Sequence, residues 1–230
     1  MPQAPTGTAT ITRKRILMVE DHVVVRRGLS LLINDEPDLE ICGDAGSAKE
    51  ALDQIQKLHP DLVIVDITLG DESGLDLIKT IHRNDAHLPI LALSMHEELL
   101  YAERAMRAGA LGYVMKKEAS DKFITAIRQV LAGEVWVSDR MSSKIVRRLV
   151  DGGRGAGDGA EQTPLQTLTD REFEVFNYIA QGIGPTEIGK RLGVSVKTIE
   201  THREHIKAKL GCNSGAELTR FAVEWSSKHG

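Results

Sequence analysis

The sequence predicts an α/β domain built on a five-stranded parallel sheet, followed by a small all-α domain. Short β-branched apolar runs alternate with segments of helix length up to about residue 135. A Gly-rich, charged stretch with no apolar face, "DGGRGAGDGAEQTP", then interrupts this pattern. Only helical periodicity follows it. The chain therefore has two domains of different architecture.

Five strands are expected in the first domain, over the runs "RILMV", "LEICG", "DLVIV", "PILAL" and "GYVM". Each is followed by a segment whose apolar residues recur at spacings of three and four, the period of a helix with one buried face. These segments are "VVRRGLSLLIN", "SAKEALDQIQKL", "SGLDLIKTIHRN", "EELLYAERAMRAG" and "SDKFITAIRQVLAG". Ser or Asp precedes several of them as an N-cap. The regular alternation predicts a parallel sheet over residues 14–135.

The rest of the chain divides into a connector and a helical domain. Residues 136–164 are predicted to hold a connecting helix, "DRMSSKIVRRLV", and the flexible Gly-rich linker. The second domain, residues 165–230, has four helical patterns, at about 170–181, 186–192, 196–210 and 216–226.

Composition excludes several classes of protein. The 230 residues, 41% hydrophobic, suffice for two modest cores. Cys42 and Cys212 lie far apart without a CxxC pair, so a disulfide framework and a cysteine zinc site are not supported, and a reducing cytoplasm fits. No window reaches the ~18 apolar residues of a membrane span, and no apolar segment of signal-peptide form follows the basic N-terminus. We expect a cytoplasmic protein without membrane contact.

Polar side chains follow four of the five predicted strands. Glu20 and Asp21 follow the first strand, Asp66 the third, Ser94 the fourth and Lys116 the fifth. The carboxyl ends of parallel strands lie at one edge of the sheet, where ligands bind. Alone, an Asp at a strand end is usually a cap and a Lys a solvated charge. Their joint placement predicts that these groups converge in one site.

Such a group of residues is suited to phosphoryl chemistry. Three close carboxylates repel one another unless a cation lies among them, and oxygen ligands favour Mg²⁺. One oxygen of Asp66 would remain available as a nucleophile, while Lys116 and Ser94 would offer positive charge and a hydrogen bond to an incoming anion. The expected product is an acyl phosphate on Asp66, with metal and ammonium screening the charge repulsion.

Residues 14 to about 135 resemble the receiver domains of two-component response regulators, through "ILMVEDH", "DLVIVDI", "SGLDLI", "ILALS" and "AGALGYVMK". The resemblance implies a flavodoxin-like (βα)5 fold and a sensor histidine kinase as partner. It also implies roles for seven residues: Asp66 as phosphoacceptor, Glu20 and Asp21 as metal-binding acids with the Thr68 backbone carbonyl, Ser94 and Tyr113 as the switch pair, and Lys116 as the phosphate partner.

Two positions depart from the family pattern. Gly70-Asp71 stands where Pro-Gly is frequent, so this loop is expected to be more mobile and to carry an extra acid, and the phosphoryl lifetime stays open. Lys117 stands where many receivers have a proline after a cis bond, and a trans bond is expected here because a cis bond to a non-proline residue is costly.

A helix-turn-helix is predicted in the second domain. "TDRE" at 169–172 has the form of a capping box, Thr169 with Glu172, and opens the first helix. "PTEIGKRLGVSVKTIETHREHIKAKLG" then gives a short helix, a turn at Gly193, Ser195 as N-cap and a longer helix.

The longer helix has a core face and a face suited to DNA. At 3.6 residues per turn, Ile199, Ile206 and Leu210 share the buried sector. The opposite face, which would enter a groove, carries Lys197, Thr201, Glu204 and Ala208, and one flank carries possible phosphate donors, Thr198, His202, His205 and Lys209. Residues 190–209 hold six Lys or Arg against two acids. The alternative is a solvated helix in an interaction bundle.

Residues 165–225 resemble LuxR-type DNA-binding domains, through "LTDREFEVFNYIAQG", "EIGKRLGVSVKTIETHREHIKAKLG" and "AELTRFA". The whole chain then resembles a response regulator of the NarL/FixJ class. This implies base-edge contacts from Lys197, Glu200, Thr201 and Glu204, and phosphate contacts from His202, Lys207 and Lys209. Gly189, where alanine is usual, and Gly215, where arginine is common, depart from the pattern.

The last helix carries one apolar stripe, formed by Leu218, Phe221, Ala222 and Trp225. Most of the stripe should close the domain core. In the resembled family this helix also pairs two domains on DNA, so these residues are candidates for dimerisation and the active form is expected to be a homodimer.

The predicted function is that of a phosphorylation-dependent, DNA-binding transcriptional regulator and not of an enzyme, with only its own phosphoryl transfer and slow autodephosphorylation as chemistry. Phosphorylation of Asp66 would either free the longer helix from occlusion or promote pairing across the linker. A phosphatase of the haloacid dehalogenase type would need a second Asp where Thr68 stands. A regulator that uses the receiver surface without phosphorylation is the remaining alternative.

Overall fold

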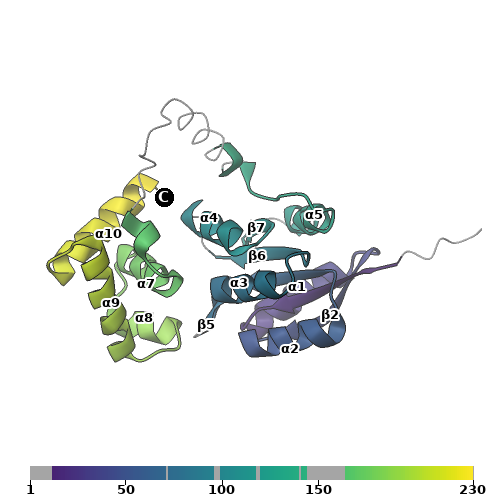
Figure 1. The fold of residues 1–230 in the computed structure, drawn as a ribbon, viewed down its shortest axis with the longest axis horizontal. Helices are drawn as coiled ribbons and strands as arrows, with labels where there is room; N and C mark the ends of the chain where they lie inside the picture. The colour runs from purple at the N-terminus through teal and green to yellow at the C-terminus, as the bar shows by residue number, and fades with distance from the viewer. Residues whose placement is uncertain are drawn as a thin grey trace, which may run out of the picture.

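The computed structural model describes residues 12–70, 72–95, 99–117, 120–139, 141–143 and 164–229. The chain forms the two predicted architectures, a domain containing the sheet and a domain of helices, and the two lie beside each other (Figure 1). No helix in these ranges is long and apolar enough to cross a membrane.

The sheet of the first domain has the predicted five strands. They are β1 (Lys14–Val19), β2 (Leu39–Ala45), β3 (Leu62–Asp66), β6 (Ile90–Ser94) and β7 (Gly112–Met115). Their order is β2-β1-β3-β6-β7, and all neighbours are parallel. From β1 the chain adds β2 on one side and then β3, β6 and β7 on the other, so the order of the strands reverses between β1 and β3. Such a reversal places a crevice at the carboxyl ends of these two strands.

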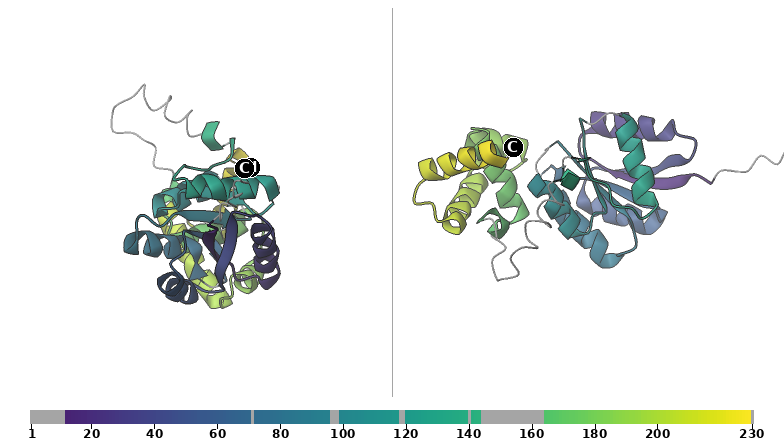
Figure 2. Two further views of the ribbon diagram at one scale, coloured as in Figure 1. Left: turned by 90° about the vertical axis from the view of Figure 1, so that its right-hand side faces the viewer. Right: turned by 90° about the horizontal axis from the view of Figure 1, so that it is seen from above.

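Helices cover both faces of this sheet. Along β1 the side chains alternate, so Ile16 and Met18 pack with α1 (Val23–Asn34) and α5 (Ser120–Leu131). Leu17 and Val19 belong to the opposite core layer, with α2 (Ala48–Leu58), α3 (Gly74–Asn84) and α4 (Leu99–Ala108). The two views of Figure 2 show the sheet enclosed between these layers. The second layer continues into the core of the second domain.

Local signals in the sequence set several helix starts. The hydroxyls of Ser47 and Ser73 accept hydrogen bonds from the backbone N–H groups of Glu50 and Asp76, capping α2 and α3. These caps confirm the predicted N-terminal signals. α1 begins after His22 without a side-chain cap.

A short hairpin follows β3 that the sequence pattern did not predict. β4 (Thr68–Leu69) pairs antiparallel with β5 (Glu72–Ser73), and Gly70 turns between them at a φ of 57°. Such a φ is unfavourable for most side chains, which gives a reason for glycine here. Asp71, predicted to add an acid near the metal, lies outside the described residues. The Lys116–Lys117 bond is trans, as expected.

The start of the predicted linker packs against the sheet. Trp136 forms a parallel bridge with Gly112, and its carbonyl accepts a hydrogen bond of 2.9 Å from the Tyr113 N–H. Met141 is buried. The boundary predicted after residue 135 therefore falls inside packed structure, because the edge of β7 offers backbone groups that Trp136 satisfies. Most of the predicted connecting helix and the whole Gly-rich stretch lie outside the described residues.

The second domain contains a 3-10 turn, η1 (Pro164–Thr167), and the four predicted helices. These are α7 (Asp170–Ala180), α8 (Pro185–Arg191), α9 (Val196–Leu210) and α10 (Gly215–His229). The capping box of Thr169 and Glu172 and the Ser195 N-cap are both present, as predicted. A Cβ on Gly189 would lie 2.8 Å from the Val194 carbonyl oxygen, so this departure from alanine permits a close approach between α8 and the turn.

Candidate functional site

The acids predicted to converge do meet at the carboxyl edge of the sheet. Glu20 and Asp21 follow β1, and Asp66 ends β3, the neighbouring strand. Each of these residues, together with His22, offers one ligand atom such that all four atoms lie within 4.8 Å of one another. Glu20 and Asp66 are fully buried, whereas His22 is largely exposed. The edge is thus an acidic site with two buried carboxylates and an exposed histidine at its rim.

Lys116 lies between two of these acids. Its Nζ is 2.7 Å from Oδ2 of Asp66 and 2.6 Å from Oε2 of Glu20. The other oxygen of Asp66, Oδ1, accepts a hydrogen bond of 3.2 Å from the Thr68 N–H. Glycine at the start of α3 permits this packing, because a Cβ on Gly74 would lie 1.9 Å from the Asp66 carbonyl oxygen.

The surroundings change the acidity of both partners in this ion pair. Burial raises the pKa of the Asp66 carboxyl to about 7, and Glu20 adds to the effect while Lys116 opposes it. Burial acts to lower the pKa of Lys116, but the charges and hydrogen bonds of Asp66 and Glu20 outweigh burial and hold that pKa above its ordinary value. A further positive charge near Asp66 would favour its ionised form.

The donor set at this edge fits a hard divalent cation. Three carboxylates supply oxygen, and Thr68, two residues after Asp66, is placed at the same edge. His22 was not among the predicted site residues, yet its Nδ1 lies 3.2 Å from Oε1 of Glu20 and 3.0 Å from Oδ1 of Asp21. Its position directly after the acidic pair was the available signal. The acidic cluster is consistent with a divalent metal site.

The predicted switch residues lie on the next two strands. Ser94 is buried at the end of β6, and its carbonyl accepts a 2.7 Å hydrogen bond from the Lys116 N–H. Tyr113 is buried on β7, paired in register with Ala92. Ser94 thus ends the strand beside β3, and Tyr113 lies one strand further from Asp66.

α9 presents most of the predicted contact residues to solvent. It lies on the side of the second domain away from the sheet (Figures 1 and 2). Ile199 and Ile206 are buried as predicted, and Leu210 is half-buried. His202 and Lys207 are also half-buried. The exposed members of the predicted set are Lys197, Thr198, Glu200, Thr201, Glu204, His205, Ala208 and Lys209.

Several of these side chains have partners within the domain. Nζ of Lys209 is 2.6 Å from Oε2 of Glu172, and Nδ1 of His205 is 3.7 Å from Oε1 of the same residue. Lys207 forms an ion pair of 2.8 Å with Glu204 along the helix. Burial lowers the pKa of His202. The sequence placed these residues on a common face but gave no sign of the link to Glu172.

The apolar stripe on α10 is divided between core and surface. Leu218 and Ala222 are fully buried, so they close the domain core and cannot form a dimer surface. Phe221 and Trp225 are half-buried and stack on each other at 6.3 Å between ring centroids. Of the four predicted dimerisation residues, only these two retain exposed surface.

Comparison with known proteins assigns each of the two domains to a family. Residues 16–128 match the response regulator receiver domain family, and residues 166–222 match the bacterial regulatory proteins of the luxR family. The chain is 34% identical over 213 residues to the oxygen regulatory protein NreC of Staphylococcus carnosus, covering 91% of this chain and 97% of that protein. It is 33% identical over 211 residues to NreC of Staphylococcus haemolyticus, with the same coverage of both proteins.

Solved structures share the fold. A LuxR-family two-component response regulator from Aurantimonas sp. SI85-9A1 is 32% identical, covers 60% of this chain and 99% of its own, and gives a TM-score of 0.57. RcsB from Salmonella typhimurium is 22% identical, covers 93% of this chain and 98% of its own, and gives a TM-score of 0.62. With both domains matched in one order and a relative aligned over nearly its full length, this chain belongs to the two-component response regulators of the NarL/FixJ class.

Proposed function

We propose that Asp66 is the phosphoacceptor through which a sensor histidine kinase controls DNA binding by α9. The observation that carries this proposal is the cluster of Asp66, Glu20 and Lys116, joined at 2.6–2.7 Å at the carboxyl edge of the sheet. The chain is a transcription regulator that depends on phosphorylation.

In the proposed transfer, a carboxylate oxygen of Asp66 attacks the phosphorus of a phosphohistidine. The new O–P bond makes an acyl phosphate, the P–N bond breaks, and its electron pair stays on the leaving imidazole nitrogen, which takes up a proton. Lys116 moves from the carboxylate to the phosphoryl oxygens and the Ser94 hydroxyl donates to one of them. Glu20, Asp21, Asp66 and the Thr68 carbonyl would hold Mg²⁺, which supplies charge neutralisation for the transfer.

In this scheme the receiver is a substrate of the kinase. A response regulator with a DNA-binding domain is not a typical enzyme. We propose that its only reactions are this transfer and slow autodephosphorylation, in the cytoplasm, where its kinase and DNA partners would be available. Engagement of Ser94 would make room for the ring of Tyr113 and shift the receiver between two packings.

The proposed DNA contacts follow the exposure of α9. Lys197, Glu200, Thr201 and Glu204 would reach base edges, and Thr198, His202, His205, Lys207 and Lys209 would lie along the phosphates. RcsB from Salmonella enterica has been solved bound to the promoter rprA with a phosphomimetic, at 22% identity and a TM-score of 0.58. That precedent supports duplex DNA as the partner here, with a homodimer paired through Phe221 and Trp225 as the active form.

Labelling with acetyl phosphate and Mg²⁺ tests the assignment of Asp66. The purified full chain should gain one phosphoryl group by intact mass, and Asp66→Asn should gain none. Asp53→Asn, an exposed Asp on α2, is the matched control and should label as wild type does. Chelation of the divalent ion should stop labelling. Full labelling of Asp66→Asn would remove the assignment.

Binding to genomic fragments by footprinting, with and without acetyl phosphate, tests the link to DNA. Stronger protection after labelling is expected. Equal protection under both conditions, and in Asp66→Asn, would instead support the regulator that acts without phosphorylation.

A further inference from the structure

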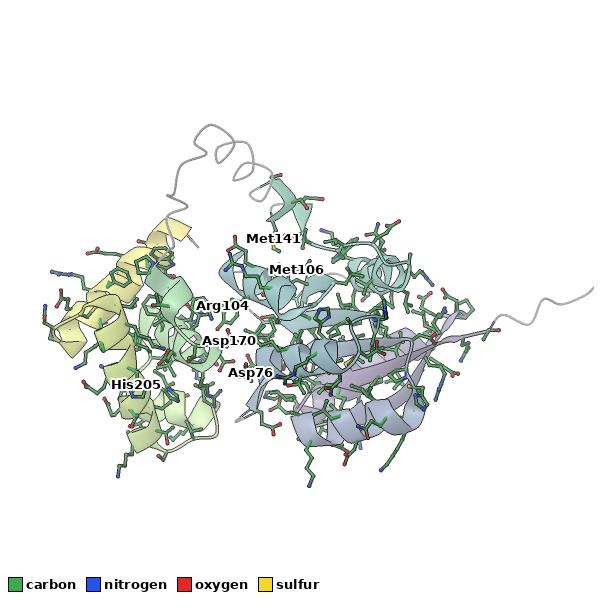
Figure 3. The ribbon with its side chains drawn as sticks, in the orientation of Figure 1. Asp76, Arg104, Met106, Met141, Asp170 and His205 are labelled. Atoms are coloured by element: carbon green, nitrogen blue, oxygen red, sulfur yellow. The ribbon has the colours of Figure 1, made fainter. Side chains whose placement is uncertain are left out.

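The second domain is held against the receiver by Asp170, the first residue of α7 (Figure 3). Its carboxylate is only 8% exposed and accepts from two cations on different receiver helices. Nη1 of Arg104 on α4 lies 2.6 Å from Oδ1, and Nζ of Lys79 on α3 lies 2.7 Å from Oδ2. The Arg104–Asp170 pair is largely buried, so the loss of either partner would leave an uncompensated charge, whereas Lys79 is about half exposed.

Arg104 forms most of the contacts between the two domains in this region. Its Nη2 donates to the carbonyl of Leu165 at 2.7 Å and to that of Leu168 at 3.0 Å, which are acceptors at the entry to α7. Its guanidinium lies over the ring of Phe173, 4.4 Å from the centroid. The Phe173 ring also packs edge-on against Tyr101 of α4, at 4.8 Å between centroids. One arginine thus joins charge, backbone and aromatic contacts across the domains.

The contact does not cover the DNA-contact face. It uses η1 and the first turns of α7, whereas the outward residues of α9 remain exposed on the other side of the domain. In this arrangement, occlusion of α9 by the described receiver residues is not seen. The contact instead fixes the orientation of the whole helical domain relative to the receiver.

Both receiver helices in this contact leave the phosphorylation edge of the sheet. α3, with Lys79, follows β3 and Asp66, and α4, with Tyr101 and Arg104, follows β6 and Ser94. Tyr101, Ala102 and Ala105 are buried, so α4 cannot shift at its sheet-facing side without moving Arg104 and Tyr101 against α7. In this structure the contact is present while Lys116 Nζ donates a hydrogen bond to Oδ2 of Asp66. In the proposed transfer, Lys116 would leave that oxygen and bind the phosphoryl group instead.

A cleft of about 480 Å³ lies beside the ion pairs, bordered by Asp76, Glu103, Arg107 and Arg171 together with the contact residues. A polar cleft that admits water makes the contact weaker than an obligate interface of the same extent and therefore easier to open.

We propose that Asp170, Arg104 and Lys79 form a latch that opens when Asp66 is phosphorylated, freeing the helical domain to reorient and pair rather than uncovering α9. This rests on the proposed phosphoacceptor. Because coupling between two sites is reciprocal, a latch that phosphorylation opens also opposes phosphorylation. Weakening the latch must then make Asp66 easier to phosphorylate, although Asp170 lies in the other domain.

The apparent affinity of the full chain for beryllofluoride with Mg²⁺, a phosphoryl mimic that binds reversibly, tests this coupling. Asp170→Asn and Arg104→Gln should each bind beryllofluoride more tightly than wild type, by about fivefold or more, the lower end of ordinary coupling between sites. Arg107→Gln is the matched control, since this residue is on the same helix and the same cleft but makes no ion pair with the described residues. It should bind beryllofluoride with wild-type affinity.

The radius of gyration from small-angle scattering, without phosphodonor, gives a second reading that does not depend on phosphorylation. Both latch variants should be more extended than wild type and the Arg107→Gln control should not. Equal affinities for beryllofluoride or equal compactness in wild type and both variants would overturn the latch. If wild type fails to label at all, the phosphoacceptor fails, and scattering still decides whether the ion pairs hold the domains together. Arg104→Gln keeps the test valid if Asp170→Asn disturbs α7.

Discussion

The ammonium of Lys209 on α9 lies 2.6 Å from Oε2 of Glu172 on α7, so a predicted phosphate contact is already ion-paired inside the domain. Glu172 is nearly buried and also accepts from the Thr169 N–H at 2.7 Å. Burial acts to raise the Glu172 pKa, but Lys209 and Thr169 outweigh it and hold that pKa below the usual range. Because an ammonium has three donors, Lys209 can keep Glu172 and still donate to a phosphate.

Lys209→Ala should therefore have two effects. DNA affinity should fall similarly on a bound fragment and on a scrambled fragment of equal length, with a salt slope shallower by about 0.9. The helical domain should also lose about 1–3 kcal/mol of stability, because Glu172 is left without its cation. Fluorescence anisotropy over a salt series measures the first effect and urea unfolding the second. Lys207→Ala, which breaks only a pair along α9, is the stability control. An unchanged salt slope would exclude Lys209 as a phosphate contact.

Lys197→Ala should act differently, through specificity. Lys197 is exposed near the start of α9, on the face predicted to enter the groove. If it reads a base edge, its loss should cost about 1–3 kcal/mol on the bound fragment and much less on the scrambled one. Parallel titrations of both fragments measure this ratio. An equal loss on both would reassign Lys197 to the phosphate backbone.

The buried Glu174 of α7 should make the helical domain more stable in mild acid. Burial raises its pKa to about 7, although Arg171, 2.8 Å away, opposes this. Since its unfolded value is 4.5, the folded domain binds the proton first, and the free energy of unfolding should rise as the pH falls from about 8 to about 5. Glu174→Gln should show a smaller rise over this window.

Urea titrations in a Trp136→Phe background measure this effect, because Trp225 on α10 is then the only tryptophan of the chain. Both proteins share every other titrating group, including Asp170 and Tyr178 nearby, so the difference isolates residue 174. Parallel pH profiles for the two proteins would contradict the assignment.

Substitution by alanine should have opposite effects on stability at two glycines. A Cβ on Gly74 would overlap the Asp66 carbonyl, so Gly74→Ala must displace β3 or α3, lowering both receiver stability and the labelling rate. A Cβ on Gly28, inside α1, would have no neighbouring atom within 4 Å, so Gly28→Ala should raise stability by about 0.5–1 kcal/mol. Thermal unfolding and acetyl phosphate labelling check both. Unimpaired labelling of Gly74→Ala would show that the Asp66 backbone adapts.

The acidic site could be predicted because strand order and chain direction constrain it. Glu20, Asp66 and Lys116 each follow an apolar run, and parallel strands bring such positions to one edge whatever the loops do. The exposed face of α9 was predictable for a similar reason, since helical periodicity separates Ile199 and Ile206 from the residues opposite. His22 could have been added to the predicted site because it follows the two acids directly. The local sequence, however, does not distinguish a histidine that lies beside a metal site from one that is merely solvated.

By itself, the sequence determined the two architectures, the carboxylates at the sheet edge, several helix caps and the exposed side of α9, because each depends on local periodicity or chain order. Tertiary structure alone decided that Asp170 meets Arg104 and Lys79, 66 and 91 residues away, and that Lys209 meets Glu172. It also decided that Trp136 extends the sheet and that Leu218 and Ala222 are buried. These contacts depend on how amphipathic elements pack, and a charged residue on a solvated face has the same sequence pattern as one that meets a distant partner.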